Sequence, residues 1–347
     1  MRVSLVMVTG GAGGLQQSIV PYAVALREFG HDVQLIMNAA SPLLAEVRSR
    51  GFSPDLVRGM RRRPMTSFFG VWRSLRAFAP DVIIGFASKG YPVAKAAARK
   101  GIPVVSRLGS MDNKKIDALL GASAILATSN EMRERVISRG QPASRVRVVP
   151  NFLIDELQPR PQAEPNRLRM GSMGRFVPRK GFDALLSAAR ILKDRGHEFD
   201  LSIAGAGTEG EALRDLARRL DIQVDWPGWV HGADKTAFLN SLDIFVCPSR
   251  EEPFGQIYLD AMRFHLPVVT TDTVGARAIF TPGKDCRMCK PDDPQALADE
   301  ISLLLNDRSL RREIGDAGAA NFASTFQMRG AGRTLCETLE ELVKHPS

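Results

Sequence analysis

The stretch PSREEPFGQIYLDAM, residues 248–262, places a turn-forming loop between an apolar strand and a helix. It follows the apolar run IFVCPS (244–249), which predicts a buried strand, and from Gln256 the apolar positions recur at helical spacing. Two acids, Glu252 and Asp260, stand eight positions apart on either side of this junction. We expect Asp260 to lie about one turn inside the helix, so that the two carboxylates can hold a small polyhydroxylated molecule.

The same strand–loop–helix order repeats along the whole chain. Such alternation predicts an α/β protein whose parallel sheets are covered by helices on both faces. The expected strands are 3–9, 32–37, 82–86, 103–108, 124–128, 145–149, 168–174, 200–205, 223–226, 244–249 and 267–272. The expected helices include 15–29, 68–78, 92–100, 131–138, 181–195, 209–220, 256–264 and 335–343.

A chain of 347 residues is long enough for two domains of about 150 residues each. The polar stretch QPRPQAEPNR (158–167) contains three prolines and is typical of a linker. We therefore expect Rossmann-like, doubly wound domains at 1–160 and 161–325 that face a cleft, where such sheets bind ligands. Residues 326–347 are predicted to form a C-terminal helix, for which crossing back to the first domain is one option.

The formal net charge of +9 comes from the first half of the chain. Residues 1–165 contain 23 Lys and Arg against 12 Asp and Glu, whereas the remainder contains 24 against 26. A basic half implies an anionic partner, such as a phosphorylated substrate or a membrane surface. We expect no nucleic acid partner, because no motif combines the basic residues with stacking aromatic side chains.

Two glycine-containing loops follow strands of the second half. In GSMGRFVPRKG (171–181), Arg175 and Lys180 flank a turn before a helix, a position that suits neutralising a diphosphate. A solvated basic loop explains this segment about equally well when it is taken alone. In IAGAGTEGEAL (203–213), Gly205 and Gly207 allow the backbone to approach a ligand closely.

The loop of the opening stretch adds a third element to this set. Taken singly, Glu252 is more often a surface carboxylate and Asp260 a charge on a helix face. The backbone amides of 254–257 begin the helix without partners and can point toward an anion. Cations, glycines and paired acids on three such loops favour a ligand site over chance.

Together these motifs resemble the retaining glycosyltransferases of sequence family 4, which have the GT-B architecture. The resemblance covers nearly the whole chain and is densest from 168 to 306. Each element alone is weak evidence, whereas the set is specific. It comprises the N-terminal glycine loop, FGHDV (29–33), VVPN (148–151), GRFVPRKG (174–181), AGAG (204–207), PGWV (227–230), PSREEPFG (248–255) with the acid that follows, and LPVVTTD (266–272).

The resemblance implies a role for each matching position. Arg175 and Lys180 would bind the diphosphate of a nucleotide-sugar donor, and Glu252 would hydrogen-bond hydroxyls of the transferred sugar; these three are the implied catalytic residues. Asp260 would accept both ribose hydroxyls, since one carboxylate can accept two hydrogen bonds. The other implied substrate contacts are Gly11, Gly13 and Gly14, Gly205 and Gly207, Val230 beside the base, and Phe254, Gly255, Gln256 and Ile257 around sugar and phosphate.

The chain departs from the family pattern at two positions. The family usually has Glu where this chain has Asp260. A family His commonly follows the strand that corresponds to PVVSRLGSMD (103–112), where this chain has Arg107 and no His. The resemblance implies that the acceptor attacks from the face that the diphosphate leaves, with the phosphate as proton acceptor.

No metal or other cofactor is expected. Arg175 and Lys180 can stabilise the charge of the leaving diphosphate by themselves, and no DxD-like acid pair lies on a loop after a strand. Cys286 and Cys289 form a CxxC without nearby His ligands, which predicts partly buried thiols and not a zinc site.

The predicted function is hexosyl transfer from a nucleotide-diphosphate sugar to a glycan or lipid-linked acceptor of the cell envelope. A nucleotide-sugar epimerase of the same architecture and a carbohydrate-binding protein without turnover are alternatives. The glycines of TGGAGG (9–14) also suggest a dinucleotide-binding oxidoreductase as a third alternative. That class needs an acid after the second strand, where this chain has Met37 and Asn38.

Residues 60–78 form a basic and apolar segment. Phe68, Val71, Trp72, Leu75 and Phe78 fall at helical spacing beside Arg61, Arg62, Arg63, Arg73 and Arg76. A helix that packs on the core with an exposed basic flank is the simpler interpretation, and docking on an anionic bilayer is the alternative.

No apolar run reaches the ~18 residues that a membrane span needs. The N-terminal run 1–14 resembles a first buried strand more than a signal peptide. We therefore expect a cytoplasmic protein, with peripheral attachment to the inner face of the membrane as an added option.

Overall fold

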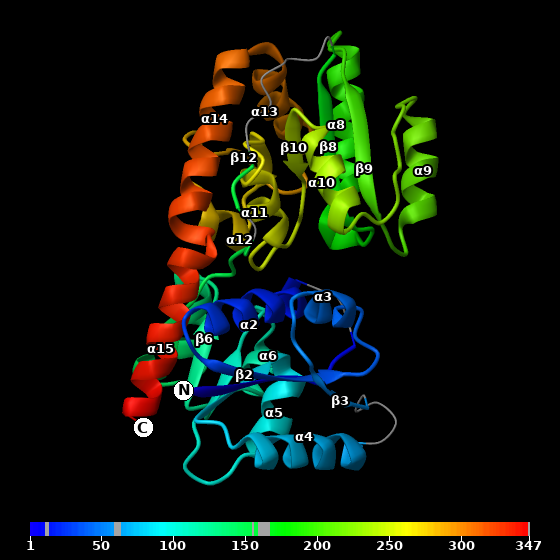
Figure 1. Ribbon diagram of the computed structural model, residues 1–347. Helices are drawn as coiled ribbons and strands as arrows, with labels where there is room; N and C mark the ends of the chain where they lie inside the picture. Colours follow the sequence, from blue (N-terminus) through cyan, green and yellow to red (C-terminus); the bar gives the residue numbers. More distant parts are fainter. Residues whose placement is uncertain (11–13, 59–63, 155, 159–166, 346–347) are drawn as a thin grey trace. The chain divides into compact units, whose positions relative to one another are not determined.

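The computed structural model describes residues 1–10, 14–58, 64–154, 156–158 and 167–345. The chain forms two compact units: unit 1 is Met1–Ile154 with Phe326–Ser347, and unit 2 is Asp155–Thr325. Unit 1 therefore contains both ends of the chain, which Figure 1 marks. The predicted boundary at 160/161 lies a few residues after the boundary between the units.

Unit 1 is built on a seven-stranded parallel sheet in the order β3-β2-β1-β4-β5-β6-β7. The chain adds strands on one side of β1 and then returns to its other side at β4, so the order reverses between these two strands. The strands are β1 (Arg2–Met7), β2 (Asp32–Asn38), β3 (Asp55–Val57), β4 (Val82–Phe86), β5 (Val104–Arg107), β6 (Ala124–Ala127) and β7 (Val146–Val148).

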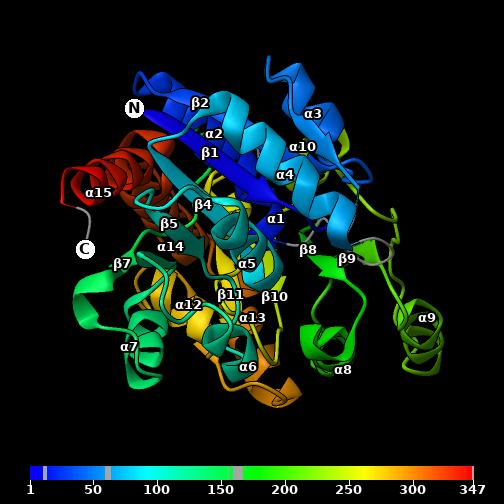
Figure 2. The same cartoon turned by 90° about the horizontal axis from the view of Figure 1, so that it is seen from below.

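Helices cover both faces of this sheet because successive side chains of β1 point to opposite sides. Val3 and Leu5 pack with α2 and α15, whereas Val6 packs with α4 and α5. Figures 1 and 2 show α4 and α2 on opposite faces. The helices are α1 (Gly14–Gln17), α2 (Ile19–Glu28), α3 (Leu44–Ser49), α4 (Pro64–Phe78), α5 (Ala87–Ala97), α6 (Asn113–Asp117), α7 (Asn130–Ser138) and α15 (Arg333–Lys344).

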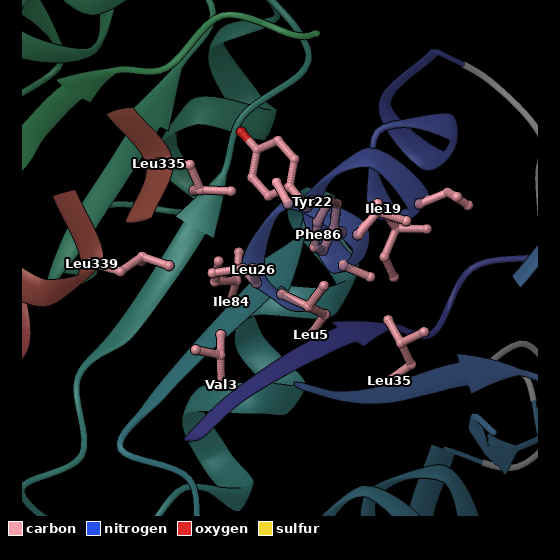
Figure 3. Packing of buried hydrophobic residues seen from close by; sticks show 14 of the residues in the cluster. Val3, Leu5, Ile19, Tyr22, Leu26, Leu35, Ile84, Phe86, Leu335 and Leu339 are labelled. Carbon is pink, nitrogen blue, oxygen red and sulfur yellow. The ribbon is translucent and has the colours of Figure 1, made fainter. Parts of the chain in front are cut away.

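The C-terminal helix α15 is part of the core of unit 1. Figure 3 shows Leu335 and Leu339 of α15 near Tyr22 and Leu26 of α2, and all four side chains are buried. The segment that leads to α15 is held to unit 1 by a backbone hydrogen bond, in which the Leu153 amide donates to the Phe326 carbonyl at 3.0 Å. Burial of the apolar stripe of α15 thus contributes to the stability of unit 1.

Unit 2 contains a five-stranded parallel sheet in the order β12-β11-β10-β8-β9, and its chain order reverses between β8 and β10. The strands are β8 (Arg169–Arg175), β9 (Asp200–Ala206), β10 (Ile244–Cys247), β11 (Val268–Thr271) and β12 (Arg287–Cys289). The helices are α8 (Phe182–Asp194), α9 (Gly210–Arg219), α10 (Gly232–Asn240), α11 (Gln256–Met262), α12 (Val274–Ile279), α13 (Pro294–Asn306) and α14 (Arg308–Asn321).

The prediction of two α/β units with parallel sheets is confirmed, but two details of the strand assignment were wrong. Residues 223–226 form no strand, because Asp225 makes only an isolated bridge with Ser202. Pro227 follows at once and has no amide to continue a ladder. The short strand β3 was not predicted, since two of its three residues are exposed and the segment lacks an apolar run.

Within the described residues, no helix is long and apolar enough to cross a membrane. This finding agrees with the absence of a long apolar run in the sequence.

Candidate active site

The loops that follow β8 and β10 lie at the carboxyl edge of the unit 2 sheet. The two strands are neighbours, and the chain order reverses between them. Doubly wound sheets bind ligands outside the carboxyl ends of the strands at such a reversal. Arg175 is the last residue of β8, and its exposed side chain forms no hydrogen bond or ion pair with the residues that the structure describes.

A tight turn carries the second predicted cation. Lys180 ends the 3-10 turn Pro178–Lys180, and the following residue, Gly181, adopts a left-handed conformation with φ 66°. A Cβ atom at Gly181 would lie 2.0 Å from the Pro248 carbonyl oxygen. Only glycine therefore lets this turn contact the loop after β10.

The contact between the two loops brings Lys180 and Glu252 together. The Lys180 ammonium donates a hydrogen bond to Oε2 of Glu252, and each side chain is only 11% exposed. This pair was expected as two separate ligand contacts, whereas the structure shows one ion pair. An incoming diphosphate would compete with Glu252 for the Lys180 ammonium.

Arg250 connects the same two loops, and sequence reasoning did not identify it. Its Nη1 donates to the Pro178 carbonyl at 2.5 Å and to Asp183 Oδ1 at 2.9 Å, and its Nη2 donates to Asp183 Oδ2 at 2.7 Å. Its Nε donates to Asp292 Oδ1 at 2.5 Å. These partners lie far away in the sequence, so the pattern of residues around Arg250 contains no signal for them.

The titration of these groups reflects the pairing. Burial alone would raise the pKa of Asp183, but the hydrogen bonds and charge of Arg250 outweigh it and leave the pKa below its usual value. The hydrogen bonds that Arg250 donates to Asp183, followed by the one that it donates to Asp292, raise the pKa of Arg250. Arg250 and its two carboxylate partners, here called the Arg250 clamp, are therefore charged near neutral pH.

Gly205 lies near the end of β9, where it pairs with Gly174 of β8, and Gly207 is the first residue after β9. A Cβ atom at Gly205 would be 2.0 Å from the Gly174 carbonyl oxygen, and one at Gly207 would be 2.4 Å from the Phe176 carbonyl oxygen. The space over both glycines is thus occupied by protein backbone. Their contact with a ligand stays a prediction, whereas their packing role is clear.

The loop after β10 enters α11 through a second left-handed glycine. Gly255 has φ 80°, and a Cβ there would lie 2.2 Å from the Tyr258 ring and 3.0 Å from Cγ of Glu252. Phe254 is buried, while Gln256 and Ile257 are half-buried at the start of α11. The Gln256 side-chain oxygen is buried and has no hydrogen-bond partner among the described residues. Gly255 therefore holds Glu252 close to the start of α11.

Asp260 lies inside α11, as the sequence predicts, and it is paired with a residue that the sequence did not single out. Lys235 of α10 donates to Asp260 Oδ1 at 2.8 Å, and the two side chains are 31% and 7% exposed. The segment before α10 contains Val230, which is half-buried, and Trp229, which is 48% exposed. This segment is fixed to the sheet by a hydrogen bond that the Gly205 amide donates to the Gly228 carbonyl at 2.7 Å.

The N-terminal glycine loop is described only in part. Gly14 begins α1, whereas Gly11 and Gly13 lie outside the described residues. In the same unit, Arg107 at the end of β5 is fully buried. It donates to the Leu126 carbonyl at 3.0 Å and to Asn151 Oδ1 at 2.5 Å, and its guanidinium lies 5.4 Å from the centre of the Tyr22 ring.

Helix α4 contains the basic and apolar segment, of which Arg61, Arg62 and Arg63 lie outside the described residues. Val71 and Leu75 are buried in the core, as the simpler interpretation predicts. Trp72 was expected in the same apolar stripe but is 40% exposed. Phe69, which was not assigned to the stripe, is 56% exposed. Trp72 points away from the core because it lies next to Val71 on the helix and therefore about 100° around its axis.

The four cysteines are free thiols and are buried, which agrees with the prediction of thiols at Cys286 and Cys289. Burial raises the pKa of Cys289 and of Cys336 to about 12, so these thiols remain protonated and unreactive at neutral pH. In the described part of the chain, no group of three or more His, Cys, Asp or Glu side chains could hold a metal ion.

Known protein families match both halves of the chain. Residues 12–156 match the family described as Glycosyltransferase Family 4, and residues 154–321 match Glycosyl transferases group 1. The lipopolysaccharide core biosynthesis glycosyltransferase LpsD of Rhizobium meliloti is 26% identical over 339 residues, which cover 91% of this chain and 92% of LpsD. The capsular polysaccharide biosynthesis glycosyltransferase CapM of Staphylococcus aureus is 30% identical over 176 residues, or 50% of this chain and 45% of CapM.

The fold is also that of solved glycosyltransferase structures. The Anabaena protein HepE, crystallised in complex with UDP and glucose, superposes with a TM-score of 0.84 and 19% identity over 99% of this chain and 100% of HepE. Since the two family matches together extend from residue 12 to residue 321 on this fold, the protein belongs to the group 1 glycosyltransferases and is an enzyme of the GT-B architecture.

Proposed function

We propose that this glycosyltransferase moves a sugar, with retention of configuration, from a nucleotide-diphosphate donor to a glycan or lipid-linked acceptor of the cell envelope. The observation that carries the proposal is the ion pair between Lys180 and Glu252, which lie on the loops after two adjacent strands, with Arg175 at the end of the first strand. Arg175 has an exposed guanidinium, and Lys180 is held beside a carboxylate. Two cations and one acid suit a diphosphate that carries a hydroxylated sugar.

The proposed step breaks the bond between the anomeric carbon and the donor phosphate oxygen. The electron pair stays on the phosphate, while an acceptor hydroxyl bonds to the anomeric carbon from the face that the diphosphate leaves. The proton of that hydroxyl passes to the departing phosphate. Arg175 and Lys180 stabilise the negative charge as it develops, and Glu252, freed from Lys180, accepts hydrogen bonds from the sugar.

The remaining donor contacts are carried over from the family pattern. By that pattern Asp260 would accept hydrogen bonds from the ribose, Val230 would face the base, and the N-terminal glycines Gly11, Gly13 and Gly14 would contact the donor. The other proposed contacts are Gly205 and Gly207 and the segment Phe254, Gly255, Gln256 and Ile257. We propose no metal and no imidazole in this mechanism, because the two cations of unit 2 already offset the charge of the diphosphate.

The test begins with a thermal-shift panel of UDP, GDP and ADP, which identifies the base. Arg175→Ala and Lys180→Ala are each expected to weaken binding of that nucleotide by about 1.5–3 kcal/mol, the contribution of a charge-assisted hydrogen bond. Lys193→Ala, which breaks the exposed Lys193–Asp221 pair of the same unit, is the control. Unchanged affinity in both site variants would exclude the diphosphate assignment.

Turnover separates the transferase from the epimerase and from a binding protein without turnover. Nucleoside diphosphate should accumulate only when donor and acceptor are both present, and EDTA should leave the rate unchanged. Release without acceptor, or conversion of the donor into a second nucleotide sugar, would contradict the proposal. A rate that collapses in EDTA and returns with a divalent cation would contradict metal independence alone.

The names of relatives support an envelope acceptor. LpsD acts in lipopolysaccharide core biosynthesis, CapM acts in capsular polysaccharide biosynthesis, and a Mycobacterium leprae relative, 33% identical over 178 residues, is named phosphatidyl-myo-inositol mannosyltransferase. We propose that the enzyme works in the cytoplasm, at the inner face of the membrane.

Helix α4 supports this location. Phe69, Trp72, Arg73 and Arg76 are exposed, and their spacing places them on one face of the helix. The Arg76 guanidinium lies 5.2 Å from the centre of the Trp72 ring. Aromatic rings beside arginines suit the interface of an anionic bilayer.

Liposome co-sedimentation tests this contact. Binding should rise with anionic lipid content, fall with salt, and weaken in Arg73→Ser/Arg76→Ser and in Trp72→Ser, while nucleotide binding stays intact. Arg133→Ser/Arg135→Ser on α7 is the matched control, since both arginines belong to the same unit. Co-sedimentation of the wild-type protein that does not change with anionic lipid content would favour a soluble acceptor.

A further inference from the structure

Asp260 is a carboxylate with a partner already in place. Its side chain is 7% exposed, and the Lys235 ammonium lies 2.8 Å from its Oδ1 atom. Loss of hydration at such a site must be offset by pairing. The pair joins α10 to α11, two helices that the chain reaches from different strands.

Lys235 is less enclosed than its partner and has donors to spare. Its side chain is 31% exposed. An ammonium has three donor hydrogens, and the bond to Asp260 is the one hydrogen bond that Lys235 side-chain nitrogen forms with the described residues. The remaining donors are therefore available to a molecule that contacts Asp260.

A vicinal diol matches this arrangement. Each hydroxyl can donate to a carboxylate oxygen and accept from an ammonium through the same oxygen atom. Asp260 also has a shorter arm than the Glu that the family usually carries at this position. A cation beside the carboxylate can supply the second contact that the shorter arm reaches less well.

We propose that Lys235 is a donor-binding residue: its ammonium donates a hydrogen bond to a ribose hydroxyl oxygen, while Asp260 accepts hydrogen bonds from the ribose. This inference rests on the proposed function, because it assigns the ribose to the Asp260 pocket. It adds a residue of α10 to the site and makes recognition depend on a Lys–Asp pair instead of on one carboxylate.

A purely structural role for Lys235 makes a different prediction. If the lysine only oriented Asp260, its removal would weaken ribonucleotide binding through that carboxylate alone. Adding Lys235→Met to Asp260→Asn would then cause no further loss of affinity, whereas a direct contact with the ribose would cause one. If it contacted a phosphate, its removal would weaken ribonucleotides and dideoxynucleotides equally. Contact with a ribose hydroxyl requires that the loss appear only where the hydroxyls are present.

The chain offers a matched control. Lys193 donates to Asp221 Oδ2 at 2.8 Å, the same distance as in the Lys235–Asp260 pair, with side chains that are 47% and 80% exposed. This pair links the last turn of α8 to the segment after α9 in the same unit, away from the carboxyl edge of the sheet. Lys193→Met should therefore leave nucleotide binding unchanged.

The experiment is calorimetric titration of the full chain with UDP, GDP and ADP and with their 2′,3′-dideoxy forms. Lys235→Met should weaken the preferred ribonucleotide by about tenfold, the effect of one hydrogen bond to a charged group, and change the dideoxy form by less than about twofold. Lys235→Arg should recover part of the lost ribonucleotide affinity. Asp260→Asn should also reduce the difference in affinity between the ribonucleotide and its dideoxy form.

Each outcome decides the proposal. An unchanged ribonucleotide affinity in Lys235→Met, or equal loss for ribo and dideoxy forms, would overturn it while leaving the proposed function standing. If no nucleotide binds to the wild type, the proposed function and this inference both fall. Thermal melts identify variants that do not fold, and if Lys235→Met is one of them, the ratio of ribo to dideoxy affinity in Lys235→Gln decides the question.

Discussion

The carboxyl edges of the two sheets differ in the partners of their cationic side chains. In unit 2, Arg250 binds two carboxylates and a carbonyl, and Lys180 binds Glu252. In unit 1, Arg107 is fully buried and has no carboxylate partner among the described residues. Its Nε atom and the Tyr22 and Ser106 hydroxyls are buried without a hydrogen-bond partner there.

The difference shows that one fold can hold its loops in two ways. Unit 2 cross-links the loops after β8 and β10 with charged hydrogen bonds, which keeps Lys180 and Glu252 in contact. Unit 1 relies on apolar packing, in which Tyr22 stacks on Phe152 with ring centres 5.6 Å apart and meets Phe86 edge-on at 5.6 Å. Replacement of polar groups should therefore be costly in unit 2 and nearly neutral in unit 1.

The largest expected effect is that of Arg250→Met. The change leaves Asp183, Asp292 and the Pro178 carbonyl without their donor, and it should lower the free energy of unfolding by about 2 kcal/mol, since these groups are partly exposed. Transfer activity should fall further than stability alone explains, because the loops of Lys180 and Glu252 lose their clamp. Urea denaturation and initial rates measure the two effects.

Arg195→Met is the control for this prediction. It breaks the Arg195–Asp299 pair, whose nitrogen and oxygen atoms are 2.7 Å apart, on the surface of the same unit. If Arg195→Met lowered stability and activity as much as Arg250→Met, the ion pairs of unit 2 would contribute equally, and the Arg250 clamp would have no particular role in positioning the loops.

The second expected effect is the acid sensitivity of the Arg250 clamp. The pKa of folded Asp183 is lowered, so its contribution is fully present above the unfolded value of about 4 and is lost as the pH falls through the lower folded pKa. The stability difference between wild type and Arg250→Met should therefore be constant near neutral pH and shrink below about pH 4. A difference that stayed constant to pH 2 would show that Asp183 is not the partner that matters.

A smaller effect is expected when Arg107 is replaced by Met. Among the described residues the buried cation has no carboxylate partner, so its desolvation is poorly compensated. Burial lowers its pKa, with the nearby Tyr22 as a smaller opposing influence. The change in unfolding free energy should stay within about 1 kcal/mol and can be favourable. If Arg107→Met and Arg250→Met cost the same, the contrast between the two units is broken.

The smallest effect is that of Tyr22→Phe. The substitution removes a buried hydroxyl that has no partner among the described residues, which should be neutral or stabilise by up to about 1 kcal/mol. Burial raises the pKa of Tyr22, so this group has no effect on the pH dependence of stability below the unfolded value of about 10 and lowers stability as the pH rises from there toward the folded pKa. Tyr22→Phe should reduce the loss of stability above pH 10, and destabilisation at neutral pH would reveal a partner for the hydroxyl.

The sequence predicted most of the architecture and the loops of the site. Apolar runs of β-branched residues predicted the buried strands, such as Val82–Phe86, because a strand covered on both faces is apolar throughout. The same reasoning failed at 223–226, where Asp225 forms only an isolated bridge. Propensity cannot show whether a segment finds a neighbouring strand to pair with.

By itself, the amino-acid sequence determined the parallel sheets, the placement of Lys180 and Glu252 on loops after strands, and the placement of Asp260 inside a helix, because these features depend on local geometry and hydrophobic period. Only the tertiary structure decided that Lys180 pairs with Glu252, that Arg250 clamps their loops, and that Lys235 meets Asp260. These pairs join residues separated by 25 to 72 positions. Their formation depends on which strands become neighbours, and no local pattern encodes that choice.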